Sequence, residues 1–162
     1  MKKYLVQFSY TLPEGKIVTD NNLVFAVNFG DAERLIHEEF EGFLNLSVNQ
    51  IKEVKISDIV YSEEVLEKEN VFFEVVVAMV EYNENTGKEK HTPYTVLVEE
   101  ETVQGASNKA IALFTMSNVF VKSAKLTKIT GIVNDDRLKL PEGVTIEVRE
   151  MGSSDMFSDM FQ

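Results

Sequence analysis

A nine-residue phrase occurs twice in this chain of 162 residues. Residues 52–60 read KEVKISDIV and residues 125–133 read KLTKITGIV, so both copies follow the pattern K-x-x-K-I-x-x-I-V. The second copy begins 73 residues after the first (125 − 52). Self-similarity at a fixed distance is the sequence signature of an internal repeat. The phrase therefore predicts a tandem duplication, in which both halves fold on the same plan.

The first half shows the patterns of two strands, a helix and a third strand. Residues 3–10 alternate apolar and polar side chains, which predicts a strand with one buried face. A second strand is predicted over 23–29. Asp31 is the predicted N-cap of a helix. The third predicted strand, about 50–60, contains the first copy of the phrase. The apolar stripe of the helix consists of Ala32, Leu35, Ile36, Phe40 and Phe43.

The second half repeats this order. Strands are predicted over 71–82 and 94–99 with a hairpin loop at 83–91, then a helix over 103–115 and a strand over 120–133. Three apolar positions of the second helix match three of the first at an offset of 74: Ala106, Ala110 and Phe114 against Ala32, Ile36 and Phe40. The agreement of pattern and spacing supports the duplication.

These patterns predict an α+β fold built from two tandem ββαβ units with antiparallel sheets and two helices. The units are residues 1–61 and 71–134, joined by an acidic linker over 62–70. Because a three-stranded sheet with one helix is too small for a good core, we expect the units to pack in a pseudo-twofold arrangement. Residues 135–150 add a C-terminal strand over 144–148, and residues 151–162 form a flexible acidic and aromatic tail.

Composition limits the functional classes. The net charge is −11, which disfavours binding to phosphate backbones unless the basic residues cluster. The chain has no cysteine, no signal-peptide pattern and no apolar run near the length of a membrane span, so we expect a cytoplasmic protein without membrane association.

No known catalytic signature is present, and the two histidines, His37 and His91, lie in unrelated contexts. The adjacent carboxylates are typical of solvated faces in so acidic a chain. The sequence therefore predicts a protein that is not an enzyme and that uses no cofactor or metal.

Basic residues are few but cluster near the second copy of the phrase. Binders of single-stranded nucleic acid combine a basic groove with aromatic side chains on which bases stack. The sequence offers the basic set Lys122, Lys125, Lys128, Arg137 and Lys139, and the aromatic set Tyr4, Phe8 and Tyr10. The other interpretation of these aromatics, which alternate with polar residues, is that they form the core. Lys52 and Lys55 occupy the equivalent strand, but three residues apart on a regular strand they are expected to face opposite sides.

The tail contains the doubled triplet D-M-F-S-D-M-F over residues 155–161. Four-residue spacing would place like residues on one side of a helix. The pattern is typical of a peptide that docks into an apolar groove with a basic rim. The alternative is a terminal segment that packs onto its own core. The predicted partner-binding residues are Asp155, Met156, Phe157, Asp159, Met160 and Phe161.

Two family resemblances follow from these residues. The two strand-strand-helix-strand units, with D-A-E-R-L-I at the helix start over 31–36, resemble an uncharacterised domain-of-unknown-function family of Bacteroidota and their phages. The tail over 155–161 is similar in style to the acidic, Phe-bearing tails of bacterial and phage single-stranded DNA-binding proteins. That second resemblance implies recruitment of replication partners through the tail.

Two functions are compatible with the sequence. The first is a non-enzymatic, phage-related protein of DNA metabolism, which binds single-stranded DNA and recruits a protein partner through its tail. The alternative is a structural or regulatory protein-interaction module, such as a phage inhibitor of a host protein or a virion component, that binds no nucleic acid. A continuous basic groove would favour the first function, and an acidic surface throughout would favour the second.

Overall fold

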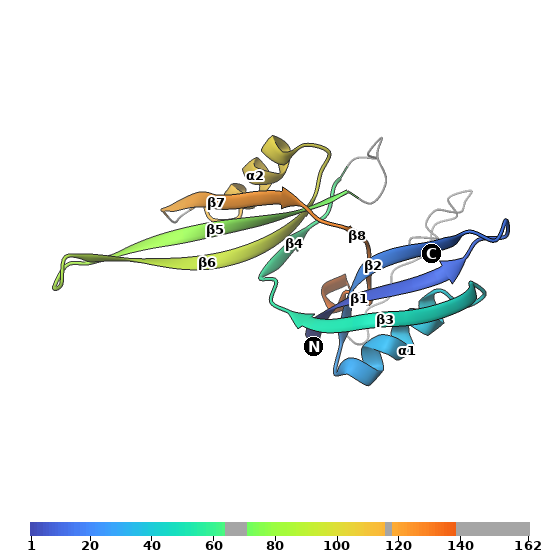
Figure 1. Ribbon diagram of the computed structural model, residues 1–162. Helices are drawn as coiled ribbons and strands as arrows, with labels where there is room; N and C mark the ends of the chain where they lie inside the picture. Colours follow the sequence, from blue (N-terminus) through green and yellow to red (C-terminus); the bar gives the residue numbers. More distant parts are fainter. Residues whose placement is uncertain (64–70, 116–117, 139–162) are drawn as a thin grey trace, which may run out of the picture.

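A computed structural model describes residues 1–63, 71–115 and 118–138. Within these residues it has eight strands in two four-stranded sheets, two α-helices and a short 3₁₀-helix, so the α+β prediction is confirmed (Figure 1). The elements are β1 (Lys2–Thr11), β2 (Ile17–Ala26), α1 (Phe29–Glu39), β3 (Leu44–Val54), β4 (Asp58–Val60), β5 (Phe72–Asn83), β6 (Lys88–Glu99), α2 (Val103–Ala112), β7 (Val119–Leu126), β8 (Ile129–Val133) and η1 (Asp136–Leu138).

The two halves exchange a strand. The first sheet has the order β3-β1-β2-β8, and the second, read in the same sense, has the order β7-β5-β6-β4. Each half thus contributes three antiparallel strands to its own sheet, and its last strand joins the sheet of the other half in parallel. A reciprocal exchange of equivalent elements is what a twofold operation generates, so the topology agrees with the predicted pseudo-twofold arrangement.

The registers of the two exchanged strands are equivalent. Ile59 of β4 pairs with Leu97 of β6, and its counterpart in β8, Ile132, pairs with Leu23 of β2. The repeated phrase therefore encodes the crossover itself. Our prediction of one continuous strand over each copy was wrong, because each copy spans the end of one strand and the start of the next. Ser57, between β3 and β4, already donates its backbone N–H to the carbonyl of Thr95 in the other half, at 2.7 Å.

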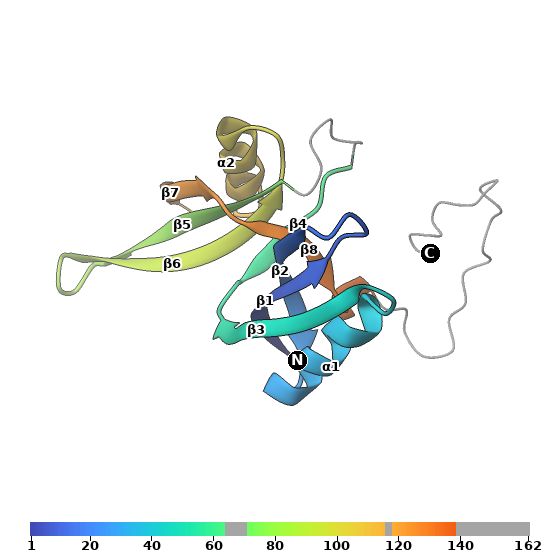
Figure 2. The ribbon, with the colours of Figure 1, turned by 45° about the vertical axis from the view of Figure 1, so that its right-hand side comes forward.

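Each helix covers the outer face of one sheet. In the first half, the buried side of β1 and β2 packs against Ala32 and Ile36 of α1. In the second half, Ala106 and Ala110 of α2 lie against the valines of β5 and β6. Figure 2 shows the two helices on opposite sides of the molecule, with β4 and β8 between them. The four helix residues are those whose spacing predicted an apolar stripe.

A third apolar cluster joins the halves where the strands cross. It contains residues of both sheets on the faces that carry no helix, together with isoleucines of both phrase copies: Leu23, Phe25, Ile56, Ile59, Phe72, Leu97 and Ile129. All seven are buried. Neither half contains this core alone, so the halves are expected to fold as one unit.

The start of α1 differs from the prediction. Asn28 is the N-cap, and its side-chain oxygen accepts a hydrogen bond from the N–H of Asp31 at 2.8 Å. The Asp31 carboxylate in turn accepts from the N–H of Val27 at 3.1 Å. This reciprocal arrangement resembles a capping box, with Asp31 as the third residue of the helix, in its first turn. The hydrogen bond from Val27 is the first of the contacts that hold the pKa of Asp31 below its usual value.

Several strand boundaries also differ. β2 begins at Ile17, six residues before the predicted start, and β6 begins at Lys88 within the predicted hairpin loop. Both strands extend along partners that are themselves long, so backbone pairing overrides the polar composition of these segments. The predicted strand over 144–148, most of the acidic linker and the tail lie outside the described residues.

Candidate functional site

A pocket of about 380 Å³ lies between the two halves, on the side of the sheets that carries no helix. All four lysines of the two phrase copies line it: Lys52, Lys55, Lys125 and Lys128. We call this pocket the lysine cleft. Among the described residues, Glu74 is the only acidic residue of the lining, so the lining carries four positive charges and one negative charge in a chain whose net charge is −11. Clusters of one sign inside a low-dielectric cleft focus the field on a ligand of the opposite sign.

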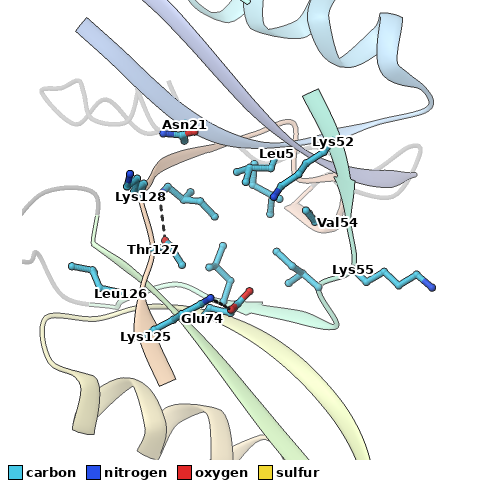
Figure 3. A pocket seen from close by; sticks show the side chains of 14 residues that line it. Leu5, Asn21, Lys52, Val54, Lys55, Glu74, Lys125, Leu126, Thr127 and Lys128 are labelled. Atoms are coloured by element: carbon cyan, nitrogen blue, oxygen red, sulfur yellow. Dashed lines mark hydrogen bonds and ion pairs between the residues drawn. The ribbon is translucent and has the colours of Figure 1, made fainter. Parts of the chain in front are cut away.

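The lysines reach the cleft from different elements (Figure 3). Lys52 lies on β3 and points into the opening, whereas Lys55 follows the end of that strand and extends outward from the rim. Lys125 lies on β7, and Lys128 lies in the turn between β7 and β8. The expectation that Lys52 and Lys55 face opposite sides assumed a regular strand through both. Because β3 ends at Val54, strand alternation does not govern Lys55. Both residues belong to the lining, but only Lys52 points into the opening (Figure 3).

The charge of the cleft is unevenly neutralised. The ammonium of Lys125 is 3.4 Å from the carboxylate of Glu74, its cross-strand partner on β5. Among the described residues, Lys52, Lys55 and Lys128 make no ion pair. The residue opposite Lys52 is Leu5 on β1, which corresponds in the first sheet to Glu74 in the second. The two halves therefore differ at this position, and three lysines are left free to bind an anion.

Apart from Asn21 and Thr127, the rest of the described lining is apolar. Leu5 and Val54 are half-buried and line it on the side of the first sheet. Leu126, at the rim on the side of the second sheet, is 61% exposed. Leu23, Ile56, Leu97 and Ile129 of the central cluster lie deeper. The cleft thus joins a basic rim to an apolar lining.

The aromatic residues predicted to stack on bases are not part of this surface. Tyr4 and Phe8 are each 1% exposed and pack in the core beneath α1, so a base has no access to them. Tyr10 is half-buried on the same face, with its ring 4.6 Å from that of Phe43. Its hydroxyl donates to Asp20 at 2.8 Å, and this bond, with burial, raises the pKa of Tyr10. Because alternate residues of β1 face opposite sides, these aromatics and the lysine cleft are separated by the sheet.

The predicted basic residues also divide. Lys125 and Lys128 line the cleft, whereas Lys122 is exposed on β7 outside its lining. Arg137 is not part of the cleft lining and makes contacts with Asp135 and Asp58, and its assignment to nucleic-acid binding stays a prediction. Lys139 and the six predicted tail residues lie outside the described residues.

Arg137 holds the end of the second crossover against the first. Its guanidinium donates to Asp135 on its own segment, with Nη2 at 2.9 Å from Oδ2. Nη1 lies 2.6 Å from Oδ1 of Asp58 on β4. Tyr61 also donates its hydroxyl to Asp135, at 2.9 Å. We call these four residues the clasp. They connect the segment that follows β8, from the second half, to β4 and Tyr61, from the first half. The clasp therefore stabilises the strand exchange.

Protonation within the clasp follows from these contacts. Burial alone would raise the pKa of Asp135, but hydrogen bonds from Arg137 and Tyr61 outweigh it and hold that pKa below its usual value. Burial raises the pKa of Tyr61 strongly, and its bond to the ionised Asp135 adds to the effect. The hydrogen bond to Asp135 raises the pKa of Arg137. All three groups therefore keep one charge state across the physiological range.

The internal repeat points to Lys52 and Lys55 as further residues of the cleft. Lys52 and Lys55 occupy the positions of Lys125 and Lys128 in the repeat, and a pseudo-twofold relation places equivalent residues around a common axis. Glu74 and Leu126 gave no such signal, because only the pairing of β5 with β7 brings them to the cleft.

Other kinds of site find no support in the described part of the chain. Residues 1–63, 71–115 and 118–138 contain no group of three or more His, Cys, Asp or Glu side chains placed to hold a metal ion. No helix within those ranges has the length and apolar character needed to cross a membrane.

Comparison with protein families finds a match over residues 4–135 to the domain of unknown function DUF4494. The chain belongs to this family. The DUF4494 match begins in β1 and ends at Asp135 of the clasp, so it takes in both sheets, both crossovers and the whole lysine cleft. Comparison with curated proteins finds no significant match, and comparison with solved structures finds none either.

Proposed function

We propose that this protein is a non-enzymatic binding protein of DNA metabolism, which binds single-stranded DNA at the lysine cleft. A cytoplasmic setting and an origin in Bacteroidota or their phages belong to the same proposal. The observation that carries it is the gathering of all four phrase lysines around one cleft of a strongly acidic protein.

The chemistry of the cleft suits a flexible polyanion. Lys ammonium groups bind phosphates as point charges, and release of condensed counterions drives the association. The surrounding acidity repels a rigid duplex, which would extend its phosphates over the surface on both sides of the cleft. A single strand can instead follow the cleft, with bases against the apolar side chains of Leu5 and Leu126. With the predicted aromatics buried, these apolar groups replace the stacking surface.

The test is fluorescence anisotropy of a labelled oligothymidylate at a series of salt concentrations. The double variant Lys52→Gln/Lys128→Gln removes two cleft lysines that have no ion pair among the described residues. The double variant Lys16→Gln/Lys88→Gln, at the two hairpin ends, removes the same charge elsewhere. We expect the slope of log K against log salt to fall by roughly 0.7 per lysine in the cleft variant only.

Failure of the unmodified protein to bind at low salt would refute the proposal. Equal losses in the two double variants would refute it as well, because affinity would then depend on total charge and not on the cleft.

A protein-interaction module is the second candidate. The observation favouring it is the apolar lining, since Leu126 stays 61% exposed and phosphates make no use of such a surface. In that case the oligonucleotide does not bind, and Leu126→Gln weakens capture of a protein partner while Lys16→Gln does not. The partner is then a peptide with apolar side chains between acidic ones.

A further inference from the structure

The lysine cleft is more than an anion site, because half of its lining is apolar. Leu5 and Val54 are only half-buried, and Leu126 is largely exposed, although each lies beside a lysine of the rim. Its volume of about 380 Å³ lies within the ~300–1,000 Å³ of ordinary ligand pockets. A ligand that uses the whole cleft must present apolar side chains together with negative charge.

This chain contains a segment with that chemistry. Residues 152–162 carry two acidic residues and no lysine or arginine, and each acid is followed directly by one methionine and one phenylalanine. The cleft has the opposite charge, with four lysines against Glu74. Both the apolar and the electrostatic requirements are therefore met by one sequence, D-M-F-S-D-M-F over 155–161.

The segment also starts from a suitable place. The described chain ends at Leu138, one residue after Arg137, which lies 2.6 Å from Asp58. Asp58 is two residues from Ile56, which lines the cleft. Phe157 is 19 positions along the chain from Leu138 (157 − 138), and a random coil of that length would have an end-to-end distance of roughly 24 Å. A tethered ligand over such a span has an effective concentration on the order of millimolar.

We propose that the lysine cleft binds residues 155–161 of the same chain. Phe157 and Phe161 lie against the apolar lining, and Asp155 and Asp159 face the lysine rim. The segment then occupies the surface that an oligonucleotide would use. Competition between the two rests on the function proposed above, whereas docking of the segment does not.

Paramagnetic relaxation enhancement tests the docking on the full chain. The protein has no cysteine, so Ser158→Cys accepts a single nitroxide label between the two phenylalanines. We expect the methyl resonances of Leu5, Val54 and Leu126 to lose most of their intensity when the label is paramagnetic. The exposed methyl groups of Val103 and Ile111 on α2 serve as the control for random collisions. Spectra with the label reduced confirm the fold of each variant.

Three comparisons decide the outcome. Adding Phe157→Ala/Phe161→Ala to the labelled chain should restore the cleft resonances, and this result supports the proposal. Equal broadening at α2 and at the cleft, or broadening that survives the double alanine change, overturns it. Broadening that appears only when labelled chains are mixed with isotope-labelled, nitroxide-free chains also overturns it, because the occupant is then a second copy. None of these measurements contains nucleic acid, so a failure of oligonucleotide binding leaves them interpretable.

Discussion

Lys125 lies directly across the strand pair from Glu74, with 3.4 Å between its ammonium and the carboxylate. In the described part of the chain, this is the only ion pair in which a lysine of the cleft takes part. The equivalent position in the other sheet holds Leu5, so one half of the cleft is partly neutralised and the other is not. A substitution of Glu74 alone should therefore change the net charge of the cleft.

Glu74→Gln should strengthen oligonucleotide binding. The substitution keeps the shape of the side chain and frees Lys125 to contact a phosphate, so the salt slope should become steeper by roughly 0.7. Anisotropy titrations at two salt concentrations measure this change. Glu81→Gln, farther along β5 and outside the cleft, is the matched control. An equal gain in both variants would mean that the effect reflects net charge alone.

Removing the guanidinium of the clasp should destabilise the fold. In Arg137→Met, Asp135 loses its ionic partner although its side chain is only 2% exposed. Asp135 keeps the hydrogen bond from Tyr61, and the loss of its charged partner should lower the free energy of unfolding by about 1.5–3 kcal/mol. Urea denaturation gives that quantity.

Arg34→Met provides the comparison for the clasp, because Arg34 pairs with Asp31 and Glu38 on the solvent side of α1. Ion pairs on an exposed helix face contribute little to the free energy of unfolding, because water screens both charges, so a much smaller loss is expected. Equal losses in the two variants would show that the clasp is no more than a surface ion pair.

The clasp should also make stability depend on pH in the acid range. The pKa of Asp135 is lower in the folded chain than in the unfolded chain, where an aspartate has a pKa near ~3.9. The folded state therefore binds the proton more weakly than the unfolded state. The stability that ionised Asp135 contributes is fully present above about pH 4 and is lost as the pH falls through the folded pKa. Urea denaturation at pH 7 and pH 3 should show a stability gap between the unmodified chain and Asp135→Asn that shrinks at pH 3. A gap that widens at pH 3 would contradict the assignment.

The strand exchange should couple the two sheets in unfolding. Ile59 comes from the first half but is buried beside Leu97 in the second sheet, and Ile59→Ala should cost about 2–5 kcal/mol. Hydrogen exchange measured at Val24 in the first sheet and Val98 in the second reports each half separately. Equal loss of protection at both amides is expected. If only Val98 loses protection, the halves unfold independently.

Much of the fold was predictable because it depends on local patterns. Period two in residues 3–10 gave the buried face of β1, and the spacing of Ala32 and Ile36 gave the inner side of α1. The repeated phrase indicated that a second copy of the same arrangement follows. Each of these patterns depends on residues close together in the sequence, and none depends on contacts with the other half.

The cleft could be anticipated only in part. Lys125 and Lys128 were predicted as basic ligands, and they line it together with Lys52 and Lys55. Tyr4 and Phe8 have the residue types of a stacking surface, but their alternation equally suits a core. The covering helix decides between the two interpretations.

The sequence by itself determined that the chain has two copies of a strand-strand-helix-strand plan, and which side of each strand is apolar. Only the tertiary structure decided which sheet each last strand joins. Hydrophobic alternation specifies that a segment such as β4 or β8 is a strand with a buried face, yet it does not specify the neighbouring strand. That choice depends on which open edge lies within reach after the turn at Ser57 or Lys128. Because both turns send the chain across to the other half, the four lysines of the phrase meet around one cleft.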